Sequence, residues 1–245
     1  MIKTGIIGGG RLGTIIKDAI EAGLAPECEL VGVASRSLGT TPLDLVEKGA
    51  KIVIEASKPE ALREYLIPLL ERGVTVIPLS TGALADEDLL EKARDTARRH
   101  GGRVVLPHGA EGGFDLAATF ALVPGMKGTI VQYVPERSTM PDGNPMKALP
   151  EGFKGTALEG FALSPSHLNV VIETAIACGG FENARYETRI PADGRSAFSL
   201  ELENDAAEAV ITVKNKAPRA DIPMMTTIAL SAVSTLNRIT QPVTF

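Results

Sequence analysis

The chain has 245 residues, of which 44% are hydrophobic and 22% charged, a balance typical of a globular protein of one or two domains. Its 25 basic and 30 acidic side chains give a formal net charge of −5, which argues against a broad nucleic-acid-binding surface. No apolar run approaches the roughly 18 residues that a membrane-spanning helix needs, so we expect no membrane role.

The N-terminus and the cysteines indicate the compartment. MIKTGIIGGG passes from one lysine directly into a short strand and a glycine turn, without the pattern of a secretory signal, and we expect a cytoplasmic protein. Cys28 and Cys178 lie far apart in the chain, which favours neither a disulfide framework nor a CxxC site. We expect both cysteines to be buried, and we predict no metal site.

In the first half of the chain, short β-rich runs alternate with segments of helical periodicity, as is typical of βαβ units around a parallel sheet. The predicted strands cover residues 2–7, 30–34, 52–55, 74–77 and 104–106, and the predicted helices run roughly over 11–22, 59–71 and 86–100.

The second half is predicted to be richer in strands. They are GTIVQYV (128–134), GTALEGFAL (155–163), RYETRI (185–190), AFSLELE (197–203) and AVITVKN (209–215). One helix is expected over about 166–177, with Ser164 as its N-cap and Pro165 at its first position. A last helix over 224–238 is expected to pack back on the first domain, and the Pro- and Gly-rich stretch 135–152 is the candidate for a mobile flap.

These elements predict an α/β fold with a Rossmann-type parallel sheet and a second α+β domain built on an open sheet. We assign residues 1–124 plus about 219–245 to the dinucleotide-binding domain and 125–218 to the second domain.

A glycine turn is the strongest single motif. Gly8, Gly10 and Gly13 form GxGxxG directly after a predicted strand and at the start of a predicted helix. The glycines permit a tight turn and let the backbone approach a pyrophosphate, which then lies at the positive end of the helix. The alternative is a glycine-rich turn that binds no ligand.

The end of the second predicted strand bears on the choice of cofactor. An NAD-preferring site usually has an acid about twenty residues beyond the glycines, where this chain reads VGVASRS. Arg36, between Ser35 and Ser37, suits a 2′-phosphate through paired charge-assisted hydrogen bonds. We therefore favour NADP, with NAD as the alternative, and the competing reading of Arg36 is a solvated turn residue.

Two further segments, EASKP (55–59) and LSTGAL (79–84), follow strands and so lie at the carboxyl edge of the sheet, where open α/β folds bind ligands. His108, in VLPHGAEGG (105–113), follows the next strand and should face the same cleft. The residues of this domain that we expect to contact the cofactor are Gly8, Gly10, Arg11, Leu12, Gly13, Ser35, Arg36, Ser37, Ala56, Ser57, Ser80, Thr81 and Gly82.

Four motifs resemble the aspartate dehydrogenase family in their order and spacing, over nearly the whole chain. They are STGALAD (80–86), PHGAEGGFD (107–115), PSHLNVV (165–171) with GG at 179–180, and a last helix ending in SAVSTLNR. The resemblance implies a nicotinamide dinucleotide on the first domain and a small-molecule substrate site on the second. It also implies contacts of Ala110 and Asn169 with the nicotinamide end, and a homodimer formed through the AFSLELE and AVITVKN strands.

The chain departs from that family where catalysis is expected. The family's histidine lies in an N-x-H stretch, where this chain has SAF ending at Phe198, and no histidine follows His167. The serine of the family's PSGA is His108 here, the first asparagine of its NxN is His167, and its T-R-K-P-P stretch is VPERS at 134–138.

We interpret these changes as an acid/base group relocated to His167 or, second, to His108. His167 is expected in the first turn of its helix, where the positive end favours a neutral imidazole that can accept a proton. A structural role is the alternative for each of the two, and His100 is expected to be a solvated or capping residue.

The sequence thus predicts an NAD(P)-dependent oxidoreductase that transfers a hydride between nicotinamide and a small carboxylate-bearing amino acid or imine. The alternatives are a reductase for another imine or aldehyde and a catalytically silent NADP-binding protein. Arg137, Lys154 and Arg195 are the candidates for holding a substrate carboxylate.

Overall fold

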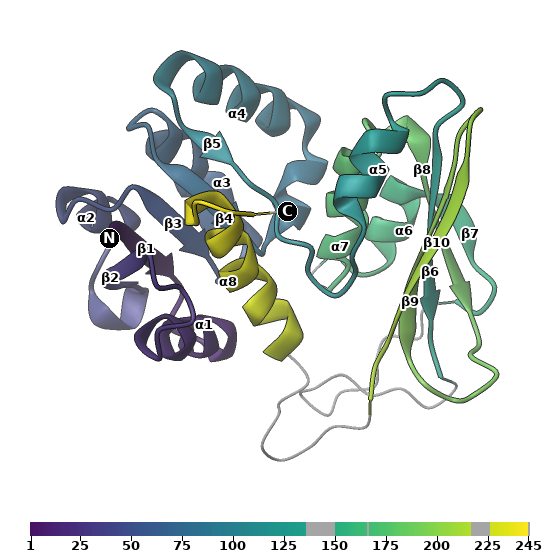
Figure 1. Cartoon of the computed structure of the whole chain (residues 1–245), viewed down its shortest axis with the longest axis horizontal. Coiled ribbons are helices and arrows are strands. Elements are labelled where there is room, and N and C mark those ends of the chain that lie inside the picture. The colour runs from purple at the N-terminus through teal and green to yellow at the C-terminus, as the bar shows by residue number, and fades with distance from the viewer. Residues whose placement is uncertain (136–149, 166, 217–225, 245) are drawn as a thin grey trace. The chain divides into compact units, whose positions relative to one another are not determined.

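The computed structural model describes residues 1–135, 150–165, 167–216 and 226–244 (Figure 1). The chain divides into two compact units, Met1–Gly109 with Met225–Phe245, and Ala110–Met224. Among the described residues, no helix has the length and apolar character needed to cross a bilayer.

Unit 1 is built on a parallel sheet whose five strands lie in the order β2-β1-β3-β4-β5. Because the chain moves from β1 to β2 on one side and then to β3 on the other, the strand order reverses beside β1, and such a switch point is where open α/β sheets bind ligands. The strands are β1 (Ile2–Ile7), β2 (Cys28–Ala34), β3 (Ile52–Glu55), β4 (Thr75–Pro78) and β5 (Arg103–Val104).

Helices cover both faces of this sheet (Figure 1). On one face, α1 (Arg11–Glu21) and α8 (Thr226–Thr240) share an apolar core with Ile6, Ile54 and Ile77 of the strands. The last helix therefore packs on the first unit, as predicted. The other helices of this unit are α2 (Pro42–Glu47), α3 (Pro59–Leu70) and α4 (Glu87–His100).

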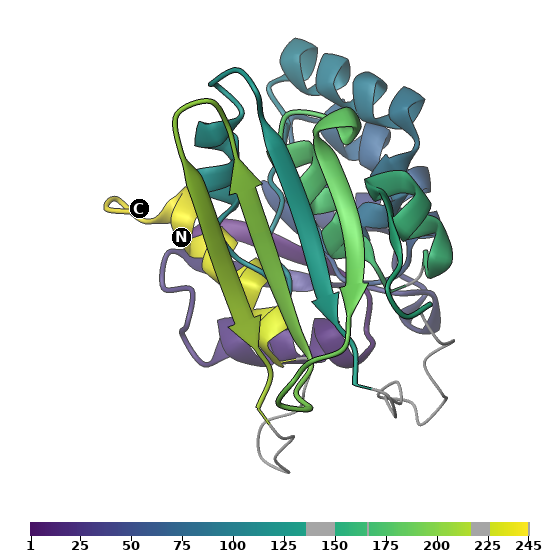
Figure 2. The same ribbon diagram turned by 90° about the vertical axis from the view of Figure 1, so that its right-hand side faces the viewer.

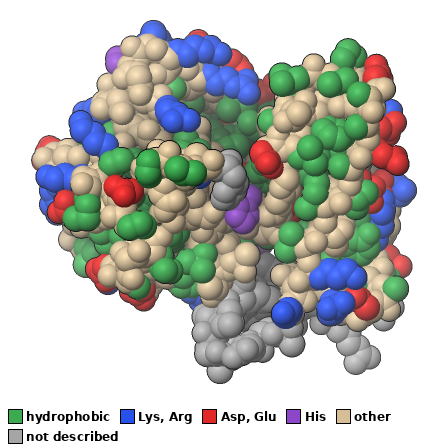
Figure 3. Space-filling view, viewed as in Figure 1, with side chains coloured by type: hydrophobic (Ala, Val, Ile, Leu, Met, Phe, Trp, Pro, Cys, Tyr) green, Lys and Arg blue, Asp and Glu red, His purple; other side chains and the backbone are tan. Residues whose placement is uncertain are grey.

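The outer face of α4 is charged and exposed to solvent. Lys and Arg side chains gather on the surface over this helix (Figure 3). Arg94 pairs with Glu91, and Arg98 Nη1 lies 3.0 Å from Asp95 Oδ1, so these arginines complete ion pairs along their own helix.

Unit 2 is built on a mixed sheet of five strands in the order β10-β9-β6-β8-β7, in which β6 and β8 are parallel and the other pairs antiparallel (Figure 2). Helices cover one face of this sheet. The elements are α5 (Phe114–Phe120), β6 (Lys127–Tyr133), β7 (Lys154–Thr156), α6 (Ala157–Leu163), α7 (Asn169–Ala177), β8 (Ala184–Arg189), β9 (Ala197–Glu203) and β10 (Glu208–Lys214).

The predicted strand over 155–163 is wrong beyond its first two residues, because a helix, α6, begins at Ala157. A capping box starts this helix: the Glu159 amide donates to Thr156 Oγ1 at 3.2 Å, and the Thr156 amide donates to Glu159 Oε2 at 2.8 Å. These two bonds satisfy the amides of Thr156 and Glu159, which in a strand would instead need partners on a neighbouring strand.

The helix predicted over about 166–177 begins at Asn169, so Ser164 is not its N-cap and Pro165 is not in its first turn. Instead, the Ser164 carbonyl accepts hydrogen bonds from the amides of His167 and Leu168, at 3.0 and 3.1 Å. These bonds form a separate turn, and His167 precedes the helix rather than lying within its first turn.

The units divide at Gly109, whereas the sequence predicts a domain boundary near 124. The difference is the segment that holds α5, whose Ala117 and Phe120 pack in one cluster with Cys178, Leu200 and Leu202 of unit 2. Of the predicted flap over 135–152, residues 136–149 lie outside the described residues.

Candidate functional site

The glycines of the turn between β1 and α1 are of two kinds: those that the protein's own packing requires and one that borders open space. Gly8 has a φ of +108°, and a Cβ on it would lie 2.5 Å from the Ala56 carbonyl oxygen. A Cβ on Gly13 would lie 1.9 Å from the Gly8 carbonyl oxygen, so both positions need glycine for the protein's own packing. A Cβ on Gly10 would meet no heavy atom within 4 Å. The space beside Gly10, at the start of α1, is therefore open.

This open space adjoins free amide groups of the helix. Gly10 is the N-cap of the 11-residue α1, and no side chain caps the helix. The first amides of a helix have no hydrogen-bond partner within the helix, and they give its N-terminal end a positive partial charge. Arg11 is exposed beside them and Leu12 is half-buried against the core of unit 1. The arrangement fits the pyrophosphate of a dinucleotide.

Ser35, Arg36 and Ser37 follow β2 at the same edge of the sheet. Ser35 Oγ lies 3.0 Å from Ser37 Oγ, and 3.6 Å from where a Cβ on Gly9 would stand, so this segment adjoins the glycine turn. Arg36 begins a 3₁₀ turn over Arg36–Leu38, and its side chain is exposed. A guanidinium next to two hydroxyls and open to solvent suits a phosphate on a ribose.

Glu55, at the end of β3, is a site residue that the sequence reasoning missed. Its carboxyl is buried and accepts four hydrogen bonds, from the amide and hydroxyl of Ser57 at 2.7 and 2.8 Å and from the amide and hydroxyl of Ser80 at 3.1 and 3.2 Å. Burial raises the pKa of Glu55 more than these bonds lower it. Glu55 thus fixes two predicted cofactor contacts that follow different strands.

The other predicted cofactor contacts of unit 1 lie at the same edge. Ala56 is buried behind Gly8, and Thr81 and Gly82 are buried in a 3₁₀ turn over Thr81–Ala85 that follows β4. The structure therefore brings the glycine turn, the serine segment and the ends of β3 and β4 to one edge of the parallel sheet.

The two candidate acid/base residues belong to different units. His108 follows β5 in unit 1 and is half-buried, whereas His167 is exposed in unit 2, with Nδ1 3.0 Å from Ser164 Oγ. Ala110 is the first residue of unit 2, and Asn169 is the first residue of α7. His100 ends α4 and is exposed.

Two of the candidates for binding a substrate carboxylate are already paired with acids. Lys154 Nζ lies 3.6 Å from Glu187 Oε1. Arg195 Nη2 lies 2.8 Å from Asp193 Oδ2, and the hydrogen bonds from Arg195 hold the pKa of Asp193 well below its usual range. Arg137 lies outside the described residues.

Phe198 stands on β9 where the family pattern has its histidine. It is partly buried against a cluster that includes Leu168, Val170 and Tyr186. The position is therefore part of the apolar packing between the sheet and α7 of unit 2.

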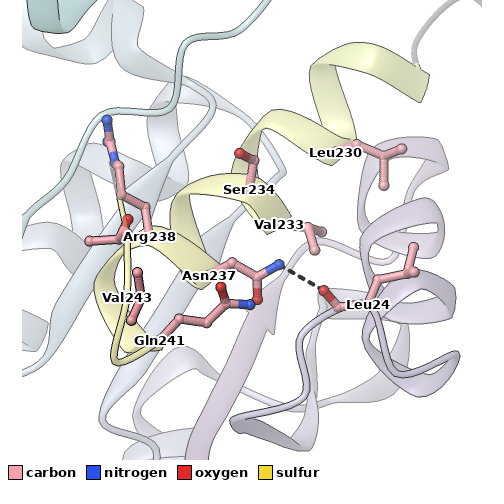
Figure 4. Close-up of a pocket in the computed structure, with 9 residues that line it drawn as sticks. Leu24, Leu230, Val233, Ser234, Asn237, Arg238, Gln241 and Val243 are labelled. Atoms are coloured by element: carbon pink, nitrogen blue, oxygen red, sulfur yellow. Dashed lines mark hydrogen bonds between the residues drawn. The ribbon is translucent and has the colours of Figure 1, made fainter.

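A surface pocket of about 350 Å³ lies elsewhere on unit 1, between α8 and the residues that follow α1 (Figure 4). Leu24 and Val233 line it, and the Asn237 amide donates to the Leu24 carbonyl oxygen at 2.7 Å. Because Leu24 follows the end of α1 and the glycine turn precedes its start, the pocket is separate from the predicted dinucleotide site. Among the described residues, no group of three or more His, Cys, Asp or Glu side chains could hold a metal ion.

The chain is similar to known dehydrogenases over its whole length. Residues 5–107 match the family described as "Homoserine dehydrogenase, NAD binding domain". The L-aspartate dehydrogenase of Methanocella arvoryzae is 27% identical and that of Methanosarcina mazei 29%, each alignment covering 99% of this chain and 98% of the relative. The crystal structure of aspartate dehydrogenase from Thermotoga maritima shares the fold, with a TM-score of 0.75 at 22% identity, over 100% of this chain and 99% of that one.

Three observations agree: full-length similarity to L-aspartate dehydrogenases, a matching nucleotide-binding domain, and a glycine turn that leaves room for a pyrophosphate. The chain is an NAD(P)-dependent oxidoreductase that resembles L-aspartate dehydrogenases over its whole length.

Proposed function

We propose that this chain is an NADP-dependent dehydrogenase that interconverts L-aspartate with oxaloacetate and ammonia through the imine. The observation that carries the proposal is the similarity to curated L-aspartate dehydrogenases over 99% of the chain. When bound, the nicotinamide accepts or returns the hydride, and the protein orients the substrate and moves protons.

The residues of unit 1 suit the adenosine and pyrophosphate parts of the cofactor. The open space at Gly10 and the first amides of α1 would hold the pyrophosphate. Arg36, with its flanking serines, would bind the 2′-phosphate that distinguishes NADP from NAD. Ser57 and Ser80, both hydrogen-bonded to Glu55, would also contact the cofactor. Ala110 and Asn169 are the contacts with the nicotinamide end that the resemblance to aspartate dehydrogenases implies.

His167 is the proposed acid/base group. A general base needs a lone pair on the ring nitrogen that faces the substrate. If Nδ1 carries the proton and donates it to Ser164 Oγ, 3.0 Å away, Nε2 holds that lone pair. His108 is proposed to position the substrate.

The decisive experiment measures nicotinamide absorbance with the purified protein. We expect oxaloacetate with ammonia to oxidise NADPH faster than NADH, and no oxidation when ammonia is omitted. Oxidation without ammonia would identify a carbonyl reductase. Cofactor binding with no turnover on any amino or oxo acid would identify a binding protein, a candidate that the apolar packing of Phe198 at the family's histidine position favours.

Replacement of His167 tests the acid/base assignment. His167→Ala should lower kcat about a hundredfold while leaving the Kd for NADPH nearly unchanged, since general acid–base catalysis contributes ~10²–10⁴. His108→Ala should raise the KM for the substrate more than it lowers kcat. The matched control is His100→Ala, on the exposed end of α4. Full kcat in the His167 variant would remove it from the mechanism.

We also propose a homodimer formed through β9 and β10. β10 is an edge strand of its sheet, and Val210 on it is 68% exposed, so a partner could cover it. Light scattering during gel filtration would measure the mass, and a monomer at micromolar concentration would exclude this proposal. A cytoplasmic location stays a prediction from the sequence.

A further inference from the structure

Ser57, which follows β3, directs both of its hydrogen-bond donors at one buried group. Its amide and its hydroxyl donate to Glu55 Oε1 at 2.7 and 2.8 Å. Glu55 is 0% exposed, whereas Ser57 is exposed. Ser57 therefore stands between a buried acid and the solvent at the carboxyl edge of the parallel sheet.

The Glu55 carboxyl is also held from the neighbouring strand. The Ser80 amide donates to Glu55 Oε2 at 3.1 Å and the Ser80 hydroxyl donates to Oε1 at 3.2 Å, and Ser80 follows β4. An amide can only donate and a carboxylate can only accept, so Glu55 is the acceptor in all four bonds. The carboxyl could turn away from Ser57 only by losing its bonds to Ser80.

These bonds determine which groups Ser57 can bind. A serine hydroxyl has one proton and two lone pairs. Since the proton of Ser57 is committed to Glu55, the hydroxyl oxygen has only lone pairs left for a ligand. Phosphate oxygens accept hydrogen bonds too, and the carboxylate behind the serine repels their charge. The exposed side of Ser57 therefore suits a ligand hydroxyl that donates, and not a phosphate.

The place of Ser57 in the sheet indicates which ligand hydroxyl this is. Ser57 Cβ lies 3.0 Å from where a Cβ on Gly8 would stand, so Ser57 adjoins the glycine turn. In the strand order β2-β1-β3-β4, Arg36 follows β2, the glycine turn follows β1 and Ser57 follows β3. A dinucleotide with its 2′-phosphate at Arg36 and its pyrophosphate at the glycine turn would bring its next part, the ribose that carries the nicotinamide, to Ser57.

Resting on the proposed cofactor site, we propose that Ser57 accepts a hydrogen bond from a hydroxyl of the ribose next to the nicotinamide, and that Glu55 is a positioning residue that keeps Ser57 an acceptor. An acid that follows β2 in many NAD sites binds ribose hydroxyls directly. Glu55 instead acts through Ser57, because its own carboxyl is fully buried.

Binding of three ligands of increasing length tests the assignment. Adenosine 2′-phosphate 5′-diphosphate ends at the pyrophosphate, ADP-ribose 2′-phosphate adds the second ribose, and NADPH adds the nicotinamide. In calorimetric titrations, Ser57→Ala should weaken the two longer ligands about three- to tenfold, as for loss of one hydrogen bond, and leave the diphosphate within about twofold of the wild type. The same series without the 2′-phosphate serves if the wild type prefers NADH.

Two other serines give matched controls. Ser37→Ala, beside Arg36, should weaken all three ligands to a similar extent, because each carries the 2′-phosphate. Ser234→Ala, on the exposed side of α8, should change none of the three affinities. If the loss in Ser57→Ala extends equally to the diphosphate, Ser57 contacts the pyrophosphate and the proposal is wrong. Unchanged affinity for all three ligands in Ser57→Ala would overturn it as well.

Glu55→Met tests the positioning role, because methionine fills the space but has no carboxyl to accept the serine protons. The readout is the preference for ADP-ribose 2′-phosphate over the diphosphate, which a loss of stability alone would not change. We expect this preference to fall about threefold or more when Ser57 is present, since the serine proton can then turn toward a phosphate, and to stay within about twofold when Glu55→Met is added to Ser57→Ala.

The outcomes of this comparison are distinct. Equal falls of the preference with and without Ser57 would overturn the proposal, because Glu55 would then not act through Ser57. If Glu55→Met does not fold, the three-ligand comparison of Ser57→Ala with the wild type decides. Binding of none of the ligands by the wild type would refute the proposed function, and this assignment with it.

Discussion

At the scale of single residues, the proposed role of Arg36 in the preference for NADP over NAD can be tested by substitution. Arg36→Asp removes a charge-assisted contact to the 2′-phosphate and places an acid where it can hold the ribose hydroxyls. We expect NADPH to bind more weakly by roughly 2–4 kcal/mol, with NADH equal or tighter. Fluorescence titration of both cofactors would measure this, with Arg63→Asp on the exposed surface of α3 as the control. Equal NADPH affinity in the Arg36 variant would remove the specificity argument.

Residues differ in how far the sequence predicts their role. The places of the glycines and of Arg36 can be predicted because a turn and a strand end fix their positions locally, while their roles stay predictions. Glu55 is not recognised in this way, because what makes it notable is burial beside a group distant in the chain, Ser80. The same reason applies to Lys154 and Arg195, whose acidic partners occupy them only in the folded protein.

At the scale of elements, substitutions at two glycines of the turn before α1 should affect folding and ligand binding differently. Gly13→Ala would drive a methyl group into the Gly8 carbonyl, so we expect loss of both stability and cofactor binding. Gly10 has a φ of −80°, which alanine adopts, and an open space. Gly10→Ala should therefore keep the wild-type melting temperature within a few degrees and weaken NADPH binding, since its methyl group occupies the space for the pyrophosphate.

Thermal melts and NADPH titrations of Gly13→Ala and Gly10→Ala would compare their stability and their affinity for the cofactor. Gly23→Ala, in the turn after α1, is the control for strain alone, because that glycine has a φ of +81° and nothing within 4 Å of a Cβ. Wild-type affinity in Gly10→Ala would show that the pyrophosphate does not lie at this turn.

Elements with a clear apolar pattern and clear ends are predicted well, whereas an element whose start depends on capping is not. The strands 2–7 and 52–55 coincide with β1 and β3, and the helix over 86–100 differs from α4 by one residue. GTALEGFAL, by contrast, has no decisive apolar period, and its helical start depends on the Thr156–Glu159 capping box. That T-x-x-E spacing was visible in the sequence and is the signal that could have identified α6.

At the scale of the whole molecule, the alternation of strands and helices predicts the parallel sheet, and the apolar face of the last helix predicts its return to the first unit. The place where the chain leaves unit 1 could not be predicted in the same way. It depends on whether α5 buries Ala117 and Phe120 against one sheet or the other, which is a tertiary choice that the short apolar segment leaves open.

The last helix completes the core of unit 1, so a substitution in its buried face should lower the stability of that unit. Leu236 is fully buried in one cluster with Ile16 and Ile20 of α1, whereas unit 2 has apolar clusters of its own. Leu236→Ala should cost about 2–5 kcal/mol of unfolding free energy through lost burial and the cavity left behind. Hydrogen exchange at pH 7 should show the loss in β1, β3 and α1, while β6, β8 and β9 keep their protection.

The matched control is Val243→Ala, because Val243 belongs to the same unit but is 84% exposed and should change stability by no more than about 0.5 kcal/mol. If the strands of unit 2 lost protection in Leu236→Ala as much as those of unit 1, the two units would unfold as one cooperative body. The separate apolar clusters would then not be separate units of stability. Loss confined to unit 1 would show that the C-terminal helix stabilises the nucleotide-binding unit alone, although the whole of unit 2 separates it in sequence from α1.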